Sequence, residues 1–120
     1  MGRVVHFEIL ADNPERAATF YESVFGWKVD RPEGISEQYW LLTTGPEGTA
    51  GINGGLMGRH FPQAVINTIE VDNLDSLIAS VEAAGGQKVH GPNNIPGVGK
   101  HAYCKDTEGN IFGALEPPKQ

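Results

Sequence analysis

The sequence repeats itself at one fixed offset, so that Asp12-Asn13 recurs as Asp72-Asn73, and this repeat limits the folds that the chain can adopt. Self-similarity at such a period indicates one supersecondary unit that is used twice. A unit of about 60 residues is marginal alone, so we expect the two copies, roughly residues 1–60 and 61–120, to form a single domain. The other matching residues are Gly26 and Gly86, Lys28-Val29 and Lys88-Val89, and Ile35 and Ile95.

The first copy carries strand, helix and turn signals in a clear order. Residues 4–10 alternate between apolar and polar side chains, which predicts a strand with one buried face. Asp12 or Asn13 can cap the helix that follows, Pro14 suits its first position, and Gly26 is a typical stop. Three short strands are then predicted between turns at 32–34 and 45–48, at residues 27–31, 37–44 and 51–57.

The second copy predicts the same order of strand, helix and three strands. A helix capped by Asn73 and ended by Gly85-Gly86 follows the strand at 64–71, and the remaining strands are 87–90, 99–105 and 110–116. The predicted fold is therefore α+β, with two βαβββ repeats that form a curved eight-stranded sheet around a cleft and carry their helices outside.

Composition excludes several classes of function. A net charge of −6 and nine scattered basic residues argue against binding to nucleic acid or to an anionic membrane surface. No apolar run approaches the roughly 20 residues of a membrane span, and no secretory signal precedes the first strand. We therefore expect a cytoplasmic protein. The lone Cys104 is expected to be a small buried hydrophobe.

Three segments together resemble the vicinal oxygen chelate superfamily, also called the glyoxalase/bleomycin resistance protein/dioxygenase superfamily. They are His6, residues 13–27 (NPERAATFYESVFGW) and residues 106–112 (DTEGNIF). The resemblance covers essentially the whole chain and implies a small-molecule ligand and a homodimer. Members include isomerases, epimerases, dioxygenases, thiol transferases and drug-sequestering proteins, so the fold leaves the chemistry open.

The resemblance also implies where a metal ion would be bound. Metal-dependent relatives use inward His, Glu or Gln side chains on the first and last strands of each repeat. His6 matches the first of these positions, whereas its counterpart in the second repeat is Ile66. The last-strand position falls on Gly113, and the same offset gives Asn53 in the first repeat. We therefore expect no cofactor in the conventional site. An atypical divalent metal site of His6 and Glu8 with Glu70 or His101 is the alternative.

Polar and aromatic side chains on the inward face are the candidate ligand contacts. Trp40 either stacks on a planar ligand or belongs to the core. Glycines in the predicted strands, including Gly55 and Gly113, mark either a close approach of ligand or backbone, or a bend in the sheet. The other candidates on the inward face are His6, Glu8, Asn53, Thr68, Glu70, His101 and Tyr103.

Two classes of function remain. The first is a small-molecule-binding protein without the conventional metal site, of a sequestering or resistance type. The second is a lyase, isomerase or dioxygenase that acts on a small oxygenated substrate. In that enzyme His6 is a metal ligand, or works with Glu8 as acid and base near neutral pH. The alternative for His6 itself is a hydrogen-bonded histidine without a catalytic role.

Overall fold

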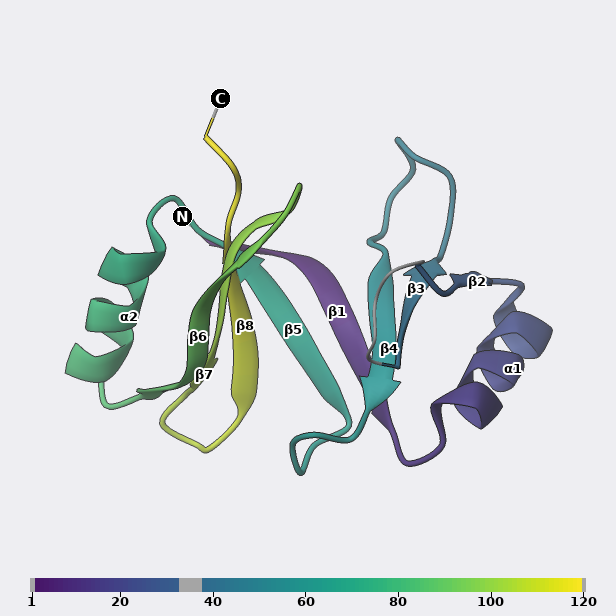
Figure 1. Ribbon diagram of the computed structural model, residues 1–120, viewed down its shortest axis with the longest axis horizontal. Coiled ribbons are helices and arrows are strands. Elements are labelled where there is room, and N and C mark those ends of the chain that lie inside the picture. The colour runs from purple at the N-terminus through teal and green to yellow at the C-terminus, as the bar shows by residue number, and fades with distance from the viewer. Residues whose placement is uncertain (1, 33–37, 120) are drawn as a thin grey trace. The chain divides into compact units, whose positions relative to one another are not determined.

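A computed structural model describes residues 2–32 and 38–119, which contain two helices and eight strands (Figure 1). The predicted α+β class and both βαβββ repeats are confirmed. Part of the turn at 32–34 and the start of the strand at 37–44 lie outside the described residues. The elements are β1 Arg3–Ala11, α1 Pro14–Phe25, β2 Lys28–Asp30, β3 Tyr39–Thr43, β4 Gly54–Gly58, β5 Val65–Glu70, α2 Leu74–Ala83, β6 Gln87–Ile95, β7 Gly99–Lys105 and β8 Ile111–Glu116.

Two compact units divide the chain close to the boundary between the repeats. The N-terminal unit comprises residues 6–66, and the C-terminal unit comprises residues 1–5 and 67–120. Strand order is β2-β3-β4-β1 in the first repeat and β5-β8-β7-β6 in the second. In each repeat the first strand pairs in parallel with the last, and the other neighbours are antiparallel. The sheet is therefore mixed, and the repeat in sequence is also a repeat in topology.

Side-chain caps define the helix ends that the sequence predicts. The Asn13 side chain accepts a hydrogen bond from the Arg16 amide at 3.1 Å, and Asn73 does the same for Ser76 at 2.9 Å. Both bonds satisfy an amide that has no partner within the helix. Gly26 ends α1 with φ of 70°, a left-handed conformation that glycine adopts without steric cost.

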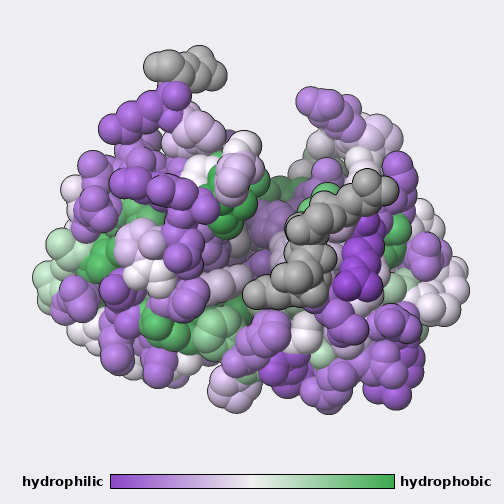
Figure 2. Space-filling view, viewed as in Figure 1, coloured by the Kyte–Doolittle hydropathy of each residue, from purple (hydrophilic) through white to green (hydrophobic). Residues whose placement is uncertain are grey.

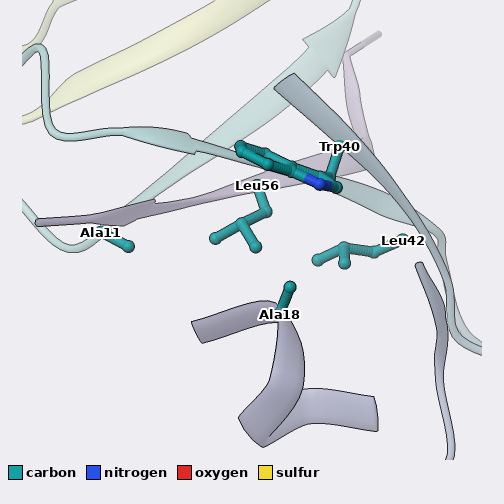
Figure 3. Close-up of a cluster of buried hydrophobic side chains, with 5 residues drawn as sticks. All are labelled: Ala11, Ala18, Trp40, Leu42 and Leu56. Atoms are coloured by element: carbon teal, nitrogen blue, oxygen red, sulfur yellow. The ribbon is translucent and has the colours of Figure 1, made fainter. Parts of the chain in front are cut away.

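The core of the N-terminal unit lies between helix α1 and one face of the strands (Figure 3). Leu42 of β3 and Leu56 of β4 point toward Ala18 of α1, and Trp40 and Ala11 complete the cluster. Successive side chains of a strand alternate between its two faces. The alternate residues of β1, β3 and β4 therefore lie on the face that turns away from α1, outside this core.

A second core lies beneath α2 in the C-terminal unit. Leu74 packs with Ala102 of β7 and Ala114 of β8, and all three are fully buried. The Glu116 carboxylate accepts a hydrogen bond from the Leu74 amide at 2.8 Å. Glu116 therefore stabilises the first turn of α2, and its side chain lies on the face of β8 opposite to that of Gly113. Cys104 is fully buried, as predicted.

Strand β6 is longer than predicted. The sequence suggested that it ends at His90, before Gly91-Pro92, but β6 continues to Ile95 beside β7. Two shifts in register, between Lys88 and His90 and between His90 and Asn93, absorb the interruption. Such irregularities let a strand continue past a proline that cannot donate to the ladder. His90 therefore lies within a strand and not at its end.

Hydrophilic residues make up much of the surface in the view of Figure 2, with smaller hydrophobic areas between them. Neither helix in the described part of the chain is long and apolar enough to cross a membrane.

Candidate active or binding site

A polar cluster lies on the strand face of the N-terminal unit that turns away from α1. His6 and Glu8 are two residues apart on β1, so both side chains project to the same face. Tyr39 of β3 projects to this face as well, because its neighbour Trp40 points to the helix side. Glu8 is only 6% exposed. The backbone pattern of two strands thus brings an imidazole, a carboxylate and a phenol together.

Hydrogen bonds link the three side chains through the Tyr39 hydroxyl. His6 Nε2 lies 3.1 Å from that oxygen, and the hydroxyl is also hydrogen-bonded to the Glu8 carboxylate. A carboxylate can only accept, so the single hydroxyl hydrogen is donated to Glu8. His6 Nε2–H is then the donor to the Tyr39 oxygen. This tautomer leaves Nδ1 of a neutral His6 as a hydrogen-bond acceptor and a base.

The cluster raises the pKa of Tyr39 far above its ordinary value. Burial of the phenol is the main cause, and the negative charge and hydrogen bond of Glu8 act in the same direction. Both effects oppose formation of a second negative charge beside the carboxylate. Tyr39 therefore remains a protonated hydrogen-bond donor throughout the physiological pH range.

Burial lowers the pKa of His6, and the charge of Glu8 opposes this shift without cancelling it. A lowered pKa in the folded state means that stability is greatest above the unfolded-state value of about 6.5. Stability then falls as the pH drops through the lower folded-state pKa. We expect the unfolding free energy to decrease more between pH 7.5 and 5.5 in the native protein than in His6→Gln, as measured by urea denaturation.

The exposed histidine of the connection between the repeats provides a control for this measurement, because His60→Gln removes an imidazole outside the cluster. Its pH dependence should match that of the native protein. Equal pH dependence in the native protein and in His6→Gln would show that His6 is not the buried, neutral group described above.

A glycine on β4 makes room for the Tyr39 hydroxyl. Gly55 is the register partner of Glu8 in the parallel β1–β4 pair, and a Cβ atom on Gly55 would overlap the hydroxyl. Gly113 holds the matching position opposite Thr68 in the β5–β8 pair. The counterpart of Gly113 is therefore Gly55 and not Asn53. The fixed offset of the repeat fails in the last strands because the preceding loops differ in length.

The C-terminal unit has a related arrangement around Gly113. A Cβ atom there would lie 2.9 Å from both His101 Nε2 and Thr68 Oγ1. Thr68 is 3% exposed, and the rings of His101 and Tyr103 meet edge to face with centroids 4.5 Å apart. His101 of β7 and Tyr39 of β3 occupy corresponding positions beside their glycines. Within the C-terminal unit the structure thus brings together Thr68, His101 and Tyr103, as it brings together His6 and Glu8 within the N-terminal unit.

Three further candidates lie elsewhere. Asn53 precedes β4, and its Oδ1 accepts a hydrogen bond from the Thr44 amide at 2.8 Å, so its side chain holds the β3–β4 connection. Trp40 is 8% exposed within the core, and the Arg31 guanidinium lies 5.4 Å from its ring centroid. Of the two roles that the sequence left open for Trp40, the structure shows the core position. Glu70 lies at the end of β5 and is exposed.

Tyr39 is the site residue that the sequence analysis did not identify. Its importance depends on contact with His6 of β1, a strand that is distant from β3 in the sequence. The sequence did contain one usable signal, the alternation of side chains between the two faces of a strand. If Trp40 belongs to the core, Tyr39 must face the other side.

The described residues do not fit the conventional metal set. Of the four expected positions, His6 alone carries a ligand atom, because Gly55, Ile66 and Gly113 have none. In residues 2–32 and 38–119 no three His, Cys, Asp or Glu side chains gather as a metal site would require. The correction from Asn53 to Gly55 leaves this result unchanged.

The family model of the Glyoxalase/Bleomycin resistance protein/Dioxygenase superfamily matches residues 3–113. The chain belongs to this superfamily. The resemblance inferred from the three sequence segments is therefore confirmed.

Individual proteins resemble the chain to different extents. The putative glyoxylase CFP32 of Mycobacterium tuberculosis is 33% identical over 123 residues, which cover 99% of this chain and 46% of CFP32. This chain thus spans about half the length of CFP32. A glyoxylase-like domain-containing protein of Didymella fabae is 31% identical, with 98% of this chain and 95% of that protein covered.

A solved structure of methylmalonyl-CoA epimerase from Mycobacterium tuberculosis has a similar fold. Its TM-score is 0.65 at 15% identity, over 97% of this chain and 88% of the epimerase. At this identity the similarity establishes the fold alone.

Proposed function

We propose that the chain is a small-molecule-binding member of its superfamily that works without the conventional metal set. The observation that supports this most is the Tyr39 hydroxyl, which occupies the space of a side chain on Gly55. A metal-ligating side chain at position 55 would therefore overlap Tyr39 in its present place. The proposal keeps the expectations of a cytoplasmic homodimer that binds neither nucleic acid nor membrane, and of a sequestering or resistance role.

The hydrogen-bond acceptors of the cluster indicate which groups its ligand must carry. Since His6 Nε2–H is directed to Tyr39, the remaining imidazole nitrogen accepts a hydrogen bond. Glu8 also accepts, and it is the source of negative charge in the cluster. A small oxygenated molecule that donates a hydroxyl hydrogen to His6 suits these groups. Thr68, Glu70, His101 and Tyr103 are retained as proposed ligand contacts within the C-terminal unit.

Metal analysis and a ligand screen together test the proposal. We expect chelator-free protein to hold far less than one divalent metal ion per chain by mass spectrometry, before and after metal is supplied. A nuclear magnetic resonance screen of small hydroxylated and carbonyl compounds should give ligands that perturb residues 6–8 and 39–43. Tyr39→Phe removes the acceptor that directs His6 Nε2–H and so fixes Nδ1 as the acceptor for the ligand. A misplaced acceptor costs about 1 kcal/mol of the hydrogen bond to the ligand, so binding should weaken about fivefold.

Tyr21→Phe is the matched control for the screen. Tyr21 stacks on Trp27, with ring centroids 5.1 Å apart, at the helix side of the unit. Its hydroxyl is outside the cluster, so ligand affinity should stay within about twofold of the native value. One metal ion per chain that is lost in His6→Ala would overturn the metal-independent proposal. Equal affinity in both tyrosine variants would overturn the proposed place of the ligand.

The same hydrogen bonds support a second candidate, an enzyme that moves a proton without a metal ion. His6 Nδ1 is positioned to take a proton from the substrate, and the imidazolium that forms would be stabilised by Glu8 through the Tyr39 hydroxyl. A substrate with an acidic C–H beside a carbonyl group suits such a base.

Methylmalonyl-CoA, named for the structural relative, is a direct probe of this candidate. Metal-free protein in deuterium oxide should exchange the C–H between its two carbonyl groups, and His6→Ala should reduce the rate at least about 100-fold, a common contribution of one acid–base group. Exchange that persists in His6→Ala would exclude His6 as the base. Binding without exchange would favour the binding protein over the enzyme.

A further inference from the structure

A groove of about 440 Å³ lies at one end of the C-terminal unit. One wall is the tip of the β6–β7 hairpin, residues 94–97 with 99 and 100. The other wall is the last residue of β8 and the chain after it, residues 116–119. In Figure 1 this stretch of chain runs beside the hairpin toward the C-terminus. The volume of the groove is in the range that is typical of small-molecule sites.

The walls of the groove are held by short-range constraints. The amide of Val98 donates to the carbonyl oxygen of Ile95 at 3.0 Å and closes the hairpin turn. Gly99 has φ of 132°, and a Cβ atom there would overlap the carbonyl oxygen of Glu116 in the opposite wall. Pro96 and two consecutive prolines after β8 add segments with fixed φ. A preformed wall reduces the ordering cost of binding a ligand.

The charge of the groove is opposite to that of the chain. Lys100 and Lys119 line it, whereas the whole protein has a net charge of −6. Glu116 also lines it, but this residue is 8% exposed and its carboxylate accepts the hydrogen bond from the Leu74 amide. Among residues 2–32 and 38–119 the ion pairs involve other cations, Lys28 and Arg59. Within those described residues neither Lys100 nor Lys119 takes part in an ion pair, so both ammonium groups can pair with an external anion.

We infer that this groove binds a small organic anion. Its acidic group, a phosphate, sulfonate or carboxylate, pairs with the two ammonium groups. Its apolar body packs against Ile95 and the prolines, in keeping with a lining that is apolar in its larger part. The groove lies in the C-terminal unit and uses none of the residues of the His6–Tyr39–Glu8 cluster, so this second site stands independently of the proposed function.

Binding of 8-anilinonaphthalene-1-sulfonate tests the inference, because this probe combines a sulfonate with apolar rings and fluoresces when it leaves water. We expect saturable binding that perturbs the amide resonances of residues 94–100 and 116–119. The double variant Lys100→Gln/Lys119→Gln should raise the dissociation constant at least tenfold. The uncharged analogue N-phenyl-1-naphthylamine should bind the native protein at least tenfold more weakly than the sulfonate.

The double variant Lys88→Gln/Lys105→Gln is the matched control. It removes the same charge, from β6 and β7 at the end of the hairpin opposite the groove. Its dissociation constant should stay within twofold of the native value, and circular dichroism should show equal folding of both variants. Tyr39→Phe should bind the probe as the native protein does. Equal weakening in the two lysine variants, or resonance changes confined to other residues, would overturn the inference.

Discussion

Replacement of Gly55 by alanine is expected to expel the Tyr39 hydroxyl from its place between His6 and Glu8. The new methyl group would overlap the hydroxyl and the adjoining ring carbon, which are side-chain atoms held in a partly buried site. The ring must therefore turn away, and both of its hydrogen bonds are lost. His6 then loses the acceptor that fixes its orientation, and a misplaced His6 costs about 1 kcal/mol of its hydrogen bond to a ligand, so we expect ligands of the cluster to bind about fivefold more weakly.

The ionisation of tyrosine reports this displacement without any ligand. The chain has three tyrosines, and phenolate formation is followed by ultraviolet absorbance. In the native protein the raised pKa of Tyr39 keeps this phenol protonated beyond its ordinary value of about 10. In Gly55→Ala we expect one additional tyrosine to titrate near pH 10.

The sign of the effect on stability follows from the same shift. A raised pKa in the folded state gives stability that is fully present below the unfolded-state value and is lost as the pH rises through the folded-state value. Native protein should thus lose stability as the pH rises above about 10, whereas Gly55→Ala, with an exposed Tyr39, should lose less over the same range. Gly58→Ala is the control, since its nearest contact would be an ordinary 3.7 Å to the His60 ring. A normal Tyr39 titration in the native protein would contradict the buried cluster.

Leu56→Ala is expected to lower the unfolding free energy by about 2–5 kcal/mol, the usual range for a fully buried leucine. Leu56 is 0% exposed and lies between Trp40, Leu42 and the helix residue Ala18 (Figure 3). Truncation removes its buried methyl groups and leaves a cavity that a rigid strand and helix cannot close. Urea denaturation with an unchanged slope would measure the loss.

Leu41→Ala provides the comparison for this value. Leu41 lies on the neighbouring strand, points to the opposite face and is 43% exposed. Its truncation should cost about 1 kcal/mol or less, since much of its surface is in water already. If the two alanine variants were equally destabilised, the assignment of the buried face of β3 and β4 would be wrong.

Local signals in the sequence were sufficient for most of the fold. Asn13, Asn73 and Gly26 act within one helical turn of their positions, so capping and helix ends could be predicted from neighbouring residues. β6 was less predictable, because the register shifts around His90 depend on its pairing with β7. The shift of the repeat from Asn53 to Gly55 likewise arises from a loop whose path only the strand pairing reveals.

The sequence by itself determined the repeat, the α+β class, the superfamily and the shared face of His6 and Glu8, because periodicity and parity are properties of neighbouring residues. Only the tertiary structure decided that Tyr39 joins them and that the space over Gly55 is filled by a phenol. Both results require β3 to lie beside β4 and β4 beside β1. Contacts of this kind depend on strands brought together from distant parts of the chain, and no local pattern encodes them.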